Sequence, residues 1–273
     1  MVLVAVLGLL AAACGGGSST SSSTSTSASG GSSTAVEASY TNTVNTKSAH
    51  MALAIGISEP GHAAVNLTGT GAASFATDES EFSLAIPQAG TFQIRLVGGK
   101  LYLMLPAQAQ AATGGKPWAA VDLSSLDPGN STVPGLGSGS SDPSQILGYL
   151  QGVSSSTTNL GSATVRGVQT THYRVVIDLN KAAQANPQAA AQYQKLISET
   201  HTSTLPVDIW TDSSDRVNQM QLQIPVPASQ GGSTAGGNVN LTLQLYDFGV
   251  PVTVAAPPAD EIGTLNIPTT TTP

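Results

Sequence analysis

The 273-residue sequence has one cysteine, few charged residues (9%) and few aromatic residues (4%). Because Cys14 is the only thiol, the folded part of the chain has no disulfide, and its stability must come from buried apolar side chains. Nine basic residues stand against sixteen acidic ones, which gives a formal net charge of −7. This balance argues against nucleic acid and anionic headgroups as electrostatic partners.

Catalytic and cofactor motifs are also missing. No Gly-x-Ser-x-Gly elbow and no phosphate-binding Gly-x-x-x-x-Gly-Lys-Ser/Thr loop occurs in the sequence. No histidine has a partner at metal-ligand spacing, so we expect no metal and no cofactor. We interpret His172, which lies in an expected strand, as structural. The chain is therefore not expected to be an enzyme. Its four histidines are His50, His62, His172 and His201.

An apolar run over residues 1–13 ends at Cys14. Thirteen helical residues rise about 20 Å, short of the ~30 Å hydrocarbon core of a bilayer, which favours a signal peptide over a membrane span. Leu10-Ala11-Ala12-Ala13-Cys14 resembles the bacterial lipobox, although Ala11 replaces the usual leucine and a basic n-region is missing. We expect cleavage before Cys14 and a lipid anchor on it, at the extracytoplasmic face of the cell membrane.

Composition divides the rest of the chain. Residues 14–34 are almost entirely Gly, Ser and Thr and are expected to form a disordered tether. Twenty such residues span roughly 25 Å. Residues 35–267 are expected to form a single domain, followed by a flexible tail over residues 268–273.

Period-2 alternation of apolar residues is the main signal within residues 35–267. Its clearest instance is a hairpin in which Phe92–Val97 and Lys100–Leu105 flank Gly98-Gly99, as a type I′ or II′ turn requires. Helices are expected over residues 35–44, from Asp142 to Leu150, and over residues 181–200 with a break near Pro187. About ten strands with short, mostly antiparallel connections and two or three helices predict an α+β domain. Further strands are expected at 51–57, 65–68, 82–86, 118–123, 163–168, 171–177, 205–210, 217–224 and 239–248.

Several segments, in order, resemble the actinobacterial LppX/LprA/LprF/LprG lipoproteins with the LolA/LolB-like fold. They are Gly99–Tyr102, Thr164–Arg174, Leu205–Trp210, Asp215–Val217, Tyr246–Val252 and Ala256–Glu261. The resemblance covers nearly all of the expected domain. It implies a curved antiparallel half-barrel with helices on its concave side around a lipid-sized apolar cavity. It also implies a surface lipoprotein that carries an acylated lipid or glycolipid.

Two readings of the apolar strands stay open. In one, the strands line a lipid cavity, whose low charge suits acyl chains. In the other, the same side chains form an ordinary packed core. A carrier and a surface interaction or sensor lipoprotein without lipid cargo, acting on an envelope protein, are the two functional alternatives. The candidate cavity residues are Phe82, Leu84, Ile86, Phe92, Ile94, Leu96, Leu101, Leu103 and Leu105.

Overall fold

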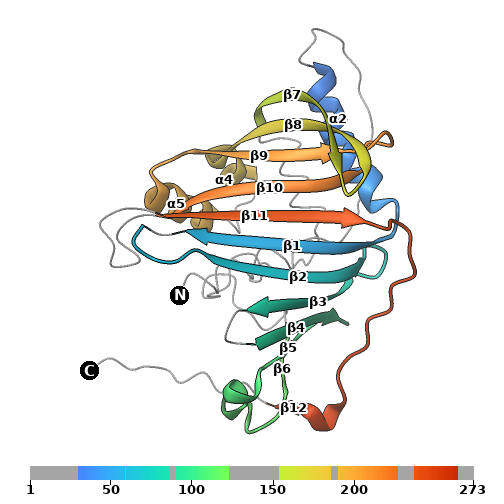
Figure 1. Cartoon of the computed structure of the whole chain (residues 1–273), viewed down its shortest axis with the longest axis vertical. Coiled ribbons are helices and arrows are strands. Elements are labelled where there is room, and N and C mark those ends of the chain that lie inside the picture. Colours follow the sequence, from blue (N-terminus) through green and yellow to red (C-terminus); the bar gives the residue numbers. More distant parts are fainter. Residues whose placement is uncertain are drawn as a thin grey trace.

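The computed structural model describes residues 30–58, 60–86, 90–122, 154–185, 190–226 and 237–263. These residues form a 12-stranded sheet with three α-helices (Figure 1). The helices are α2 (Gly30–Val44), α4 (Leu179–Ala185) and α5 (Ala190–Thr200), and the 3-10 helices are η1 (Ala107–Thr113) and η4 (Ala259–Glu261). The strands are β1 (Ser48–Ser58), β2 (Val65–Ser74), β3 (Glu79–Ile86), β4 (Gly90–Val97), β5 (Lys100–Met104), β6 (Trp118–Asp122), β7 (Ser154–Val165), β8 (Val168–Asp178), β9 (Thr204–Thr211), β10 (Val217–Val226), β11 (Gly237–Tyr246) and β12 (Ile262–Gly263).

The sheet consists of two meanders joined side by side. In the first meander, strands β1 to β6 each pair antiparallel with the next strand along the chain, and in the second meander strands β7 to β11 do the same. β1 pairs antiparallel with β11 and so joins the two meanders. β12 adds to the free edge of β6 in parallel, and β7 forms the opposite edge, so the described sheet is open. The predicted α+β class and antiparallel sheet are confirmed, with twelve strands instead of about ten. β12 has two residues, too few for a periodicity to reveal it.

Local sequence signals set the turns. Gly98 and Gly99 have φ values of 59° and 72°, which confirms the predicted hairpin and the positive φ that a type I′ turn needs. Arg166 and Gly167 also have positive φ, so the chain turns there, two residues before the expected strand end at Val168. The Asp178 carboxylate accepts a hydrogen bond from the backbone N–H of Asn180 at 2.9 Å and so caps the start of α4.

The helices agree in part with the sequence. α2 begins at Gly30, five residues before the expected start, so its first turn falls within the expected tether. The break predicted near Pro187 separates α4 from α5, while Pro187 itself and the helix expected from Asp142 lie outside the described residues. The expected boundary between signal peptide and tether and the expected start of the tail also lie outside them.

One face of the sheet carries the hydrophobic core. This core face bears Met51, Leu53 and Ile55 of β1, which are 4%, 2% and 1% exposed, whereas the outer face bears His50 and Ala54. All three helices pack on the core face of the β7–β10 half: α2 near one end of the strands, and α4 and α5 near the other (Figure 1).

A strap connects the centre of the sheet to its edge. Residues 247–261 (the C-terminal strap) run from the end of β11 past the ends of the first meander to β12 (Figure 1). The Gly249 N–H donates to the Ser48 carbonyl at 2.9 Å, the Arg95 guanidinium to the Ala255 carbonyl at 3.1 Å, and the Lys116 ammonium to the Asp260 carbonyl at 2.7 Å. The strap is therefore bound along its length.

Candidate functional site

The candidate cavity residues come from three neighbouring strands and lie on the core face. Phe82 of β3 is opposite Ile94 of β4, which is opposite Leu103 of β5, and Leu84 is opposite Phe92. Cross-strand partners project their side chains to the same face, so these residues form one continuous surface. We call this surface the apolar strip: Phe82, Leu84, Ile86, Phe92, Ile94, Leu96, Leu101, Leu103 and, directly after β5, Leu105.

Burial varies along the apolar strip. Leu84 is fully buried in the main core, and Phe82 is 7% exposed. Leu96 and Leu101 are 5% and 6% exposed and form a second, smaller cluster. The remaining five residues of the strip are partly exposed. The strip thus combines a packed part with apolar surface that is still accessible, and its role as a lipid site stays a prediction.

Phe82 lies flat against β2 because that strand has glycines where its ring rests. A Cβ on Gly69 would lie 2.5 Å from Phe82 Cε1, and one on Gly71 would lie 2.6 Å from Phe82 Cδ2. Gly71 and Phe82 are cross-strand partners. Only glycine permits this close approach. The ring therefore packs closely onto the sheet. Sequence alternation alone did not single out these two glycines.

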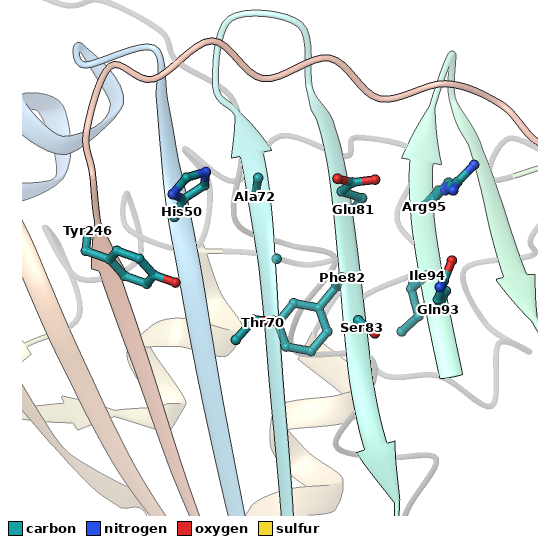
Figure 2. A pocket seen from close by; sticks show the side chains of 11 residues that line it. His50, Thr70, Ala72, Glu81, Phe82, Ser83, Gln93, Ile94, Arg95 and Tyr246 are labelled. Carbon is teal, nitrogen blue, oxygen red and sulfur yellow. The ribbon is translucent and has the colours of Figure 1, made fainter. Parts of the chain in front are cut away.

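A hollow of about 470 Å³ lies over β1 to β4 and β11 (Figure 2). Most of its lining side chains belong to the outer face, opposite the apolar strip. Figure 2 shows Tyr246, from β11, extending toward the hollow and Glu81 and Arg95 standing on the far side of Ala72. The sequence analysis missed this site. The only sequence feature that could have indicated it is a group of small residues at outer-face positions, such as Thr70, Ala72 and Ser83. The lining residues are His50, Thr70, Gly71, Ala72, Glu81, Phe82, Ser83, Gln93, Ile94, Arg95 and Tyr246.

A charged cluster occupies the outer face of the second meander. The Asp208 carboxylate accepts two hydrogen bonds from Arg174, both at 2.9 Å, and its Oδ1 lies 3.0 Å from Nε2 of His172. Burial alone would raise the pKa of Asp208, but hydrogen bonds from Arg174 and His172 and their charges outweigh it and hold that pKa below its ordinary value. The His172 ring also stacks on Trp210 at 4.1 Å. These contacts suit the structural role expected for His172.

Neither metal binding nor a membrane-spanning helix has support within the described ranges. No group of three or more His, Cys, Asp or Glu side chains there is placed to hold a metal ion. No helix in the same part of the chain is long and apolar enough to cross a membrane. Cys14, the predicted lipidation site, lies outside the described residues.

The described residues define an α+β protein built on a large, open antiparallel sheet. No protein-family model matches the sequence, and no curated protein matches it. Solved structures similar to this chain include the lipoprotein LppX of Mycobacterium tuberculosis, with 13% identity, TM-score 0.47, and coverage of 81% of this chain and 99% of that one. LprF from Mycobacterium bovis has 15% identity and TM-score 0.47 over 84% and 98% of the two chains. A LolA superfamily protein from Nitrosomonas europaea has 11% identity and TM-score 0.31 over 81% and 94%. LppX and LprF belong to the group that the sequence resembles.

Proposed function

We propose that this chain is a membrane-anchored lipoprotein that binds the acyl chains of a lipid or glycolipid against the apolar strip. In this proposal the sheet curves as a half-barrel, with the strip on its concave side. One observation carries it: five apolar side chains of the strip stay partly exposed on the core face. All remaining core-face positions of β3, β4 and β5 are also uncharged. An acyl chain, which offers no hydrogen bonds, suits such a surface.

The apolar area is sufficient for a lipid. Fully burying a Leu, Ile or Phe side chain is worth about 1.5–3 kcal/mol. If a ligand covers half of each of the five partly exposed side chains, the gross gain is roughly 4–7 kcal/mol by the same scale. The methylenes of the acyl chain are buried at the same time and add about 0.8 kcal/mol each. The loss of freedom of the ligand and the strip opposes this total, so a dissociation constant from micromolar to millimolar is expected for a single chain. A lipid with two or three chains would bind more tightly.

Copurification tests the lipid. The full chain carrying Cys14→Ser, purified from a native host and extracted with organic solvent, should release lipid at near-stoichiometric amounts by mass spectrometry. Repeated extracts without lipid would count against the carrier and favour the alternative, a surface interaction or sensor lipoprotein without cargo.

A pair of variants locates the site. Leu103→Glu puts a charge into the accessible part of the apolar strip and should abolish copurified lipid and binding of the fluorescent fatty acid cis-parinaric acid. Ala54→Glu puts the same charge on an exposed outer-face position and should leave both unchanged. Leu103→Trp, which fills the site without charge, serves if Leu103→Glu fails to fold. Equal binding by all variants would place the lipid elsewhere.

The proposed anchor has a separate test. Replacing Cys14 by alanine removes the only thiol that can be alkylated. The protein should then leave the membrane fraction or accumulate as an uncleaved precursor, and it should lose incorporation of labelled palmitate. Unchanged membrane retention with unchanged mobility would refute the anchor without touching the proposed lipid site.

A further inference from the structure

The outer face of the sheet has two halves that differ in how their polar side chains are bound. On the second meander these side chains bind one another. The Gln244 amide donates to Gln219 at 2.8 Å, and the Gln221 amide donates to Thr242 at 3.3 Å. Arg166 donates to Gln244 at 3.3 Å, and Asp208 is bound as described above. Here little hydrogen-bonding capacity is left for a ligand.

On the first meander, His50 binds Asp247 and Arg95 binds the strap, but four other outer-face side chains remain unbound. Thr70 of β2, Glu81 and Ser83 of β3, and Gln93 of β4 form no side-chain hydrogen bond to any described residue, and all four line the hollow (Figure 2). Glu81 stands opposite Arg95, yet the Arg95 guanidinium binds the strap and lies 4.8 Å from the ring centre of Trp118. The carboxylate of Glu81 is therefore available.

The strand register explains the shape of the hollow. Tyr246, His50, Ala72, Glu81 and Arg95 are successive cross-strand partners in one row across five strands. At about 4.8 Å per strand, the row spans roughly 19 Å. The small side chain of Ala72 in its middle forms a floor between larger side chains on both sides. Thr70 and Ser83 extend this floor in a neighbouring row.

We propose that this hollow binds a saccharide. The backbone groups of β1 to β4 are already paired within the sheet, so a ligand here meets side chains only, unlike a peptide that adds to a strand edge. Those side chains mix one carboxylate, one amide, hydroxyls, an imidazole and a guanidinium. Each sugar hydroxyl both donates and accepts, and it can pair with every member of this set. A multiply charged anion would face Glu81, and a lipid tail would leave the carboxylate, the amide and the hydroxyls of Thr70 and Ser83 unpaired.

The size of the hollow fits a short oligosaccharide. Its volume of about 470 Å³ lies within the usual ~300–1,000 Å³ of small-ligand sites. The site lies on the opposite face from the apolar strip. A saccharide site here is therefore independent of the proposed lipid cargo.

Chemical-shift mapping on the full chain carrying Cys14→Ser tests this site. Maltotriose, mannotriose and chitotriose are each titrated to about 10 mM, a range that detects dissociation constants near 1 mM. At least one should shift the amides of residues 70–72, 81–83 and 93–95 together. A blocked tetra-alanine peptide, titrated as a comparison, should not. Failure of all three sugars, shifts scattered over the surface, or binding of the peptide alone would each overturn the proposal.

Substitutions then fix the location. Ala72→Tyr fills the floor and should weaken binding at least tenfold, and Glu81→Gln should weaken it several-fold. Ala54→Tyr on the same face and Asp260→Asn in the strap are matched controls that should bind as wild type. If Ala72→Tyr fails to fold, Ser83→Tyr provides the same test. If Glu81→Gln and Ala72→Tyr both bind the sugar as tightly as wild type, the proposed site is refuted, whatever the lipid experiments show.

Discussion

Replacing Gly71 by alanine tests the close packing of β2 against β3. The new Cβ would lie 2.6 Å from Phe82 Cδ2 and would also overlap the carbonyl oxygen of Glu81. The ring is 7% exposed, so it must lift off β2 or the strands must separate, at a cost of about 1–3 kcal/mol. The lower entropy of the unfolded alanine chain returns about 0.4–1 kcal/mol. We expect a net loss of about 1–2 kcal/mol.

Urea unfolding followed by tryptophan fluorescence measures this loss in the full chain carrying Cys14→Ser. With a denaturant slope of about 1–3 kcal/mol/M, the midpoint should fall by roughly 0.5–1 M. Gly56→Ala is the matched control, because its Cβ would meet Asn66 Oδ1 at 3.4 Å and Asn240 Cβ at 4.0 Å, both ordinary contacts. A lifted Phe82 ring should also occupy space above the apolar strip and weaken cis-parinaric acid binding. Equal midpoints for Gly71→Ala and Gly56→Ala would refute the packing argument.

The apolar strip, the Asp208 cluster and the strap each give a further expectation. Leu84→Ala in the packed part should cost about 2–5 kcal/mol of unfolding free energy, against about 1 kcal/mol for the partly exposed Leu103→Ala; equal losses in urea would mean a uniformly packed core. Asp208→Asn should cost about 1–2 kcal/mol at pH 7. Because folding lowers the pKa of Asp208, its ionised carboxylate stabilises the fold above about pH 4, and this stabilisation disappears as the pH falls through the folded pKa. A difference in unfolding free energy between Asp208→Asn and wild type that persists unchanged at pH 2 would contradict this expectation. Arg95→Met removes the bond to Ala255 and should speed amide hydrogen exchange across the strap about fivefold, and unchanged exchange would show that this bond does not hold the strap.

Much of the first meander could be predicted from sequence because its signals are local. Alternation placed Phe82 and Leu84 on one face, and Gly98-Gly99 marked a turn whose positive φ values only glycine adopts readily. Each strand of a meander pairs with the next strand along the chain, so the order of the strands in the sheet follows from their order in the sequence. This is why the strip could be proposed before the structure was known.

Long-range features were beyond such reasoning. Most of β7 is a Ser/Thr-rich segment without alternating apolar residues, and it becomes a strand because it pairs with β8. The parallel pairing of β12 with Trp118 and Ala119 depends on where the strap ends. The outer-face hollow depends on small residues from different strands, such as Thr70 and Ser83, that come into register only in the assembled sheet.

The pairing of β1 with β11, which we call the seam, is non-local, whereas pairing within each meander is mostly local. Within each meander most neighbouring strands are joined by short loops, and closing such a hairpin takes about microseconds, whereas β8 and β9 are joined through α4 and α5. The seam joins residues as distant as His50 and Asp247, 197 apart in sequence, and it requires both meanders to be aligned over nine residue pairs. Non-local pairing of this kind slows folding because loop entropy is lost before contacts form. We therefore expect the seam to form late, so that an unfolding chain first parts into two halves, each exposing an unpaired strand to its surroundings.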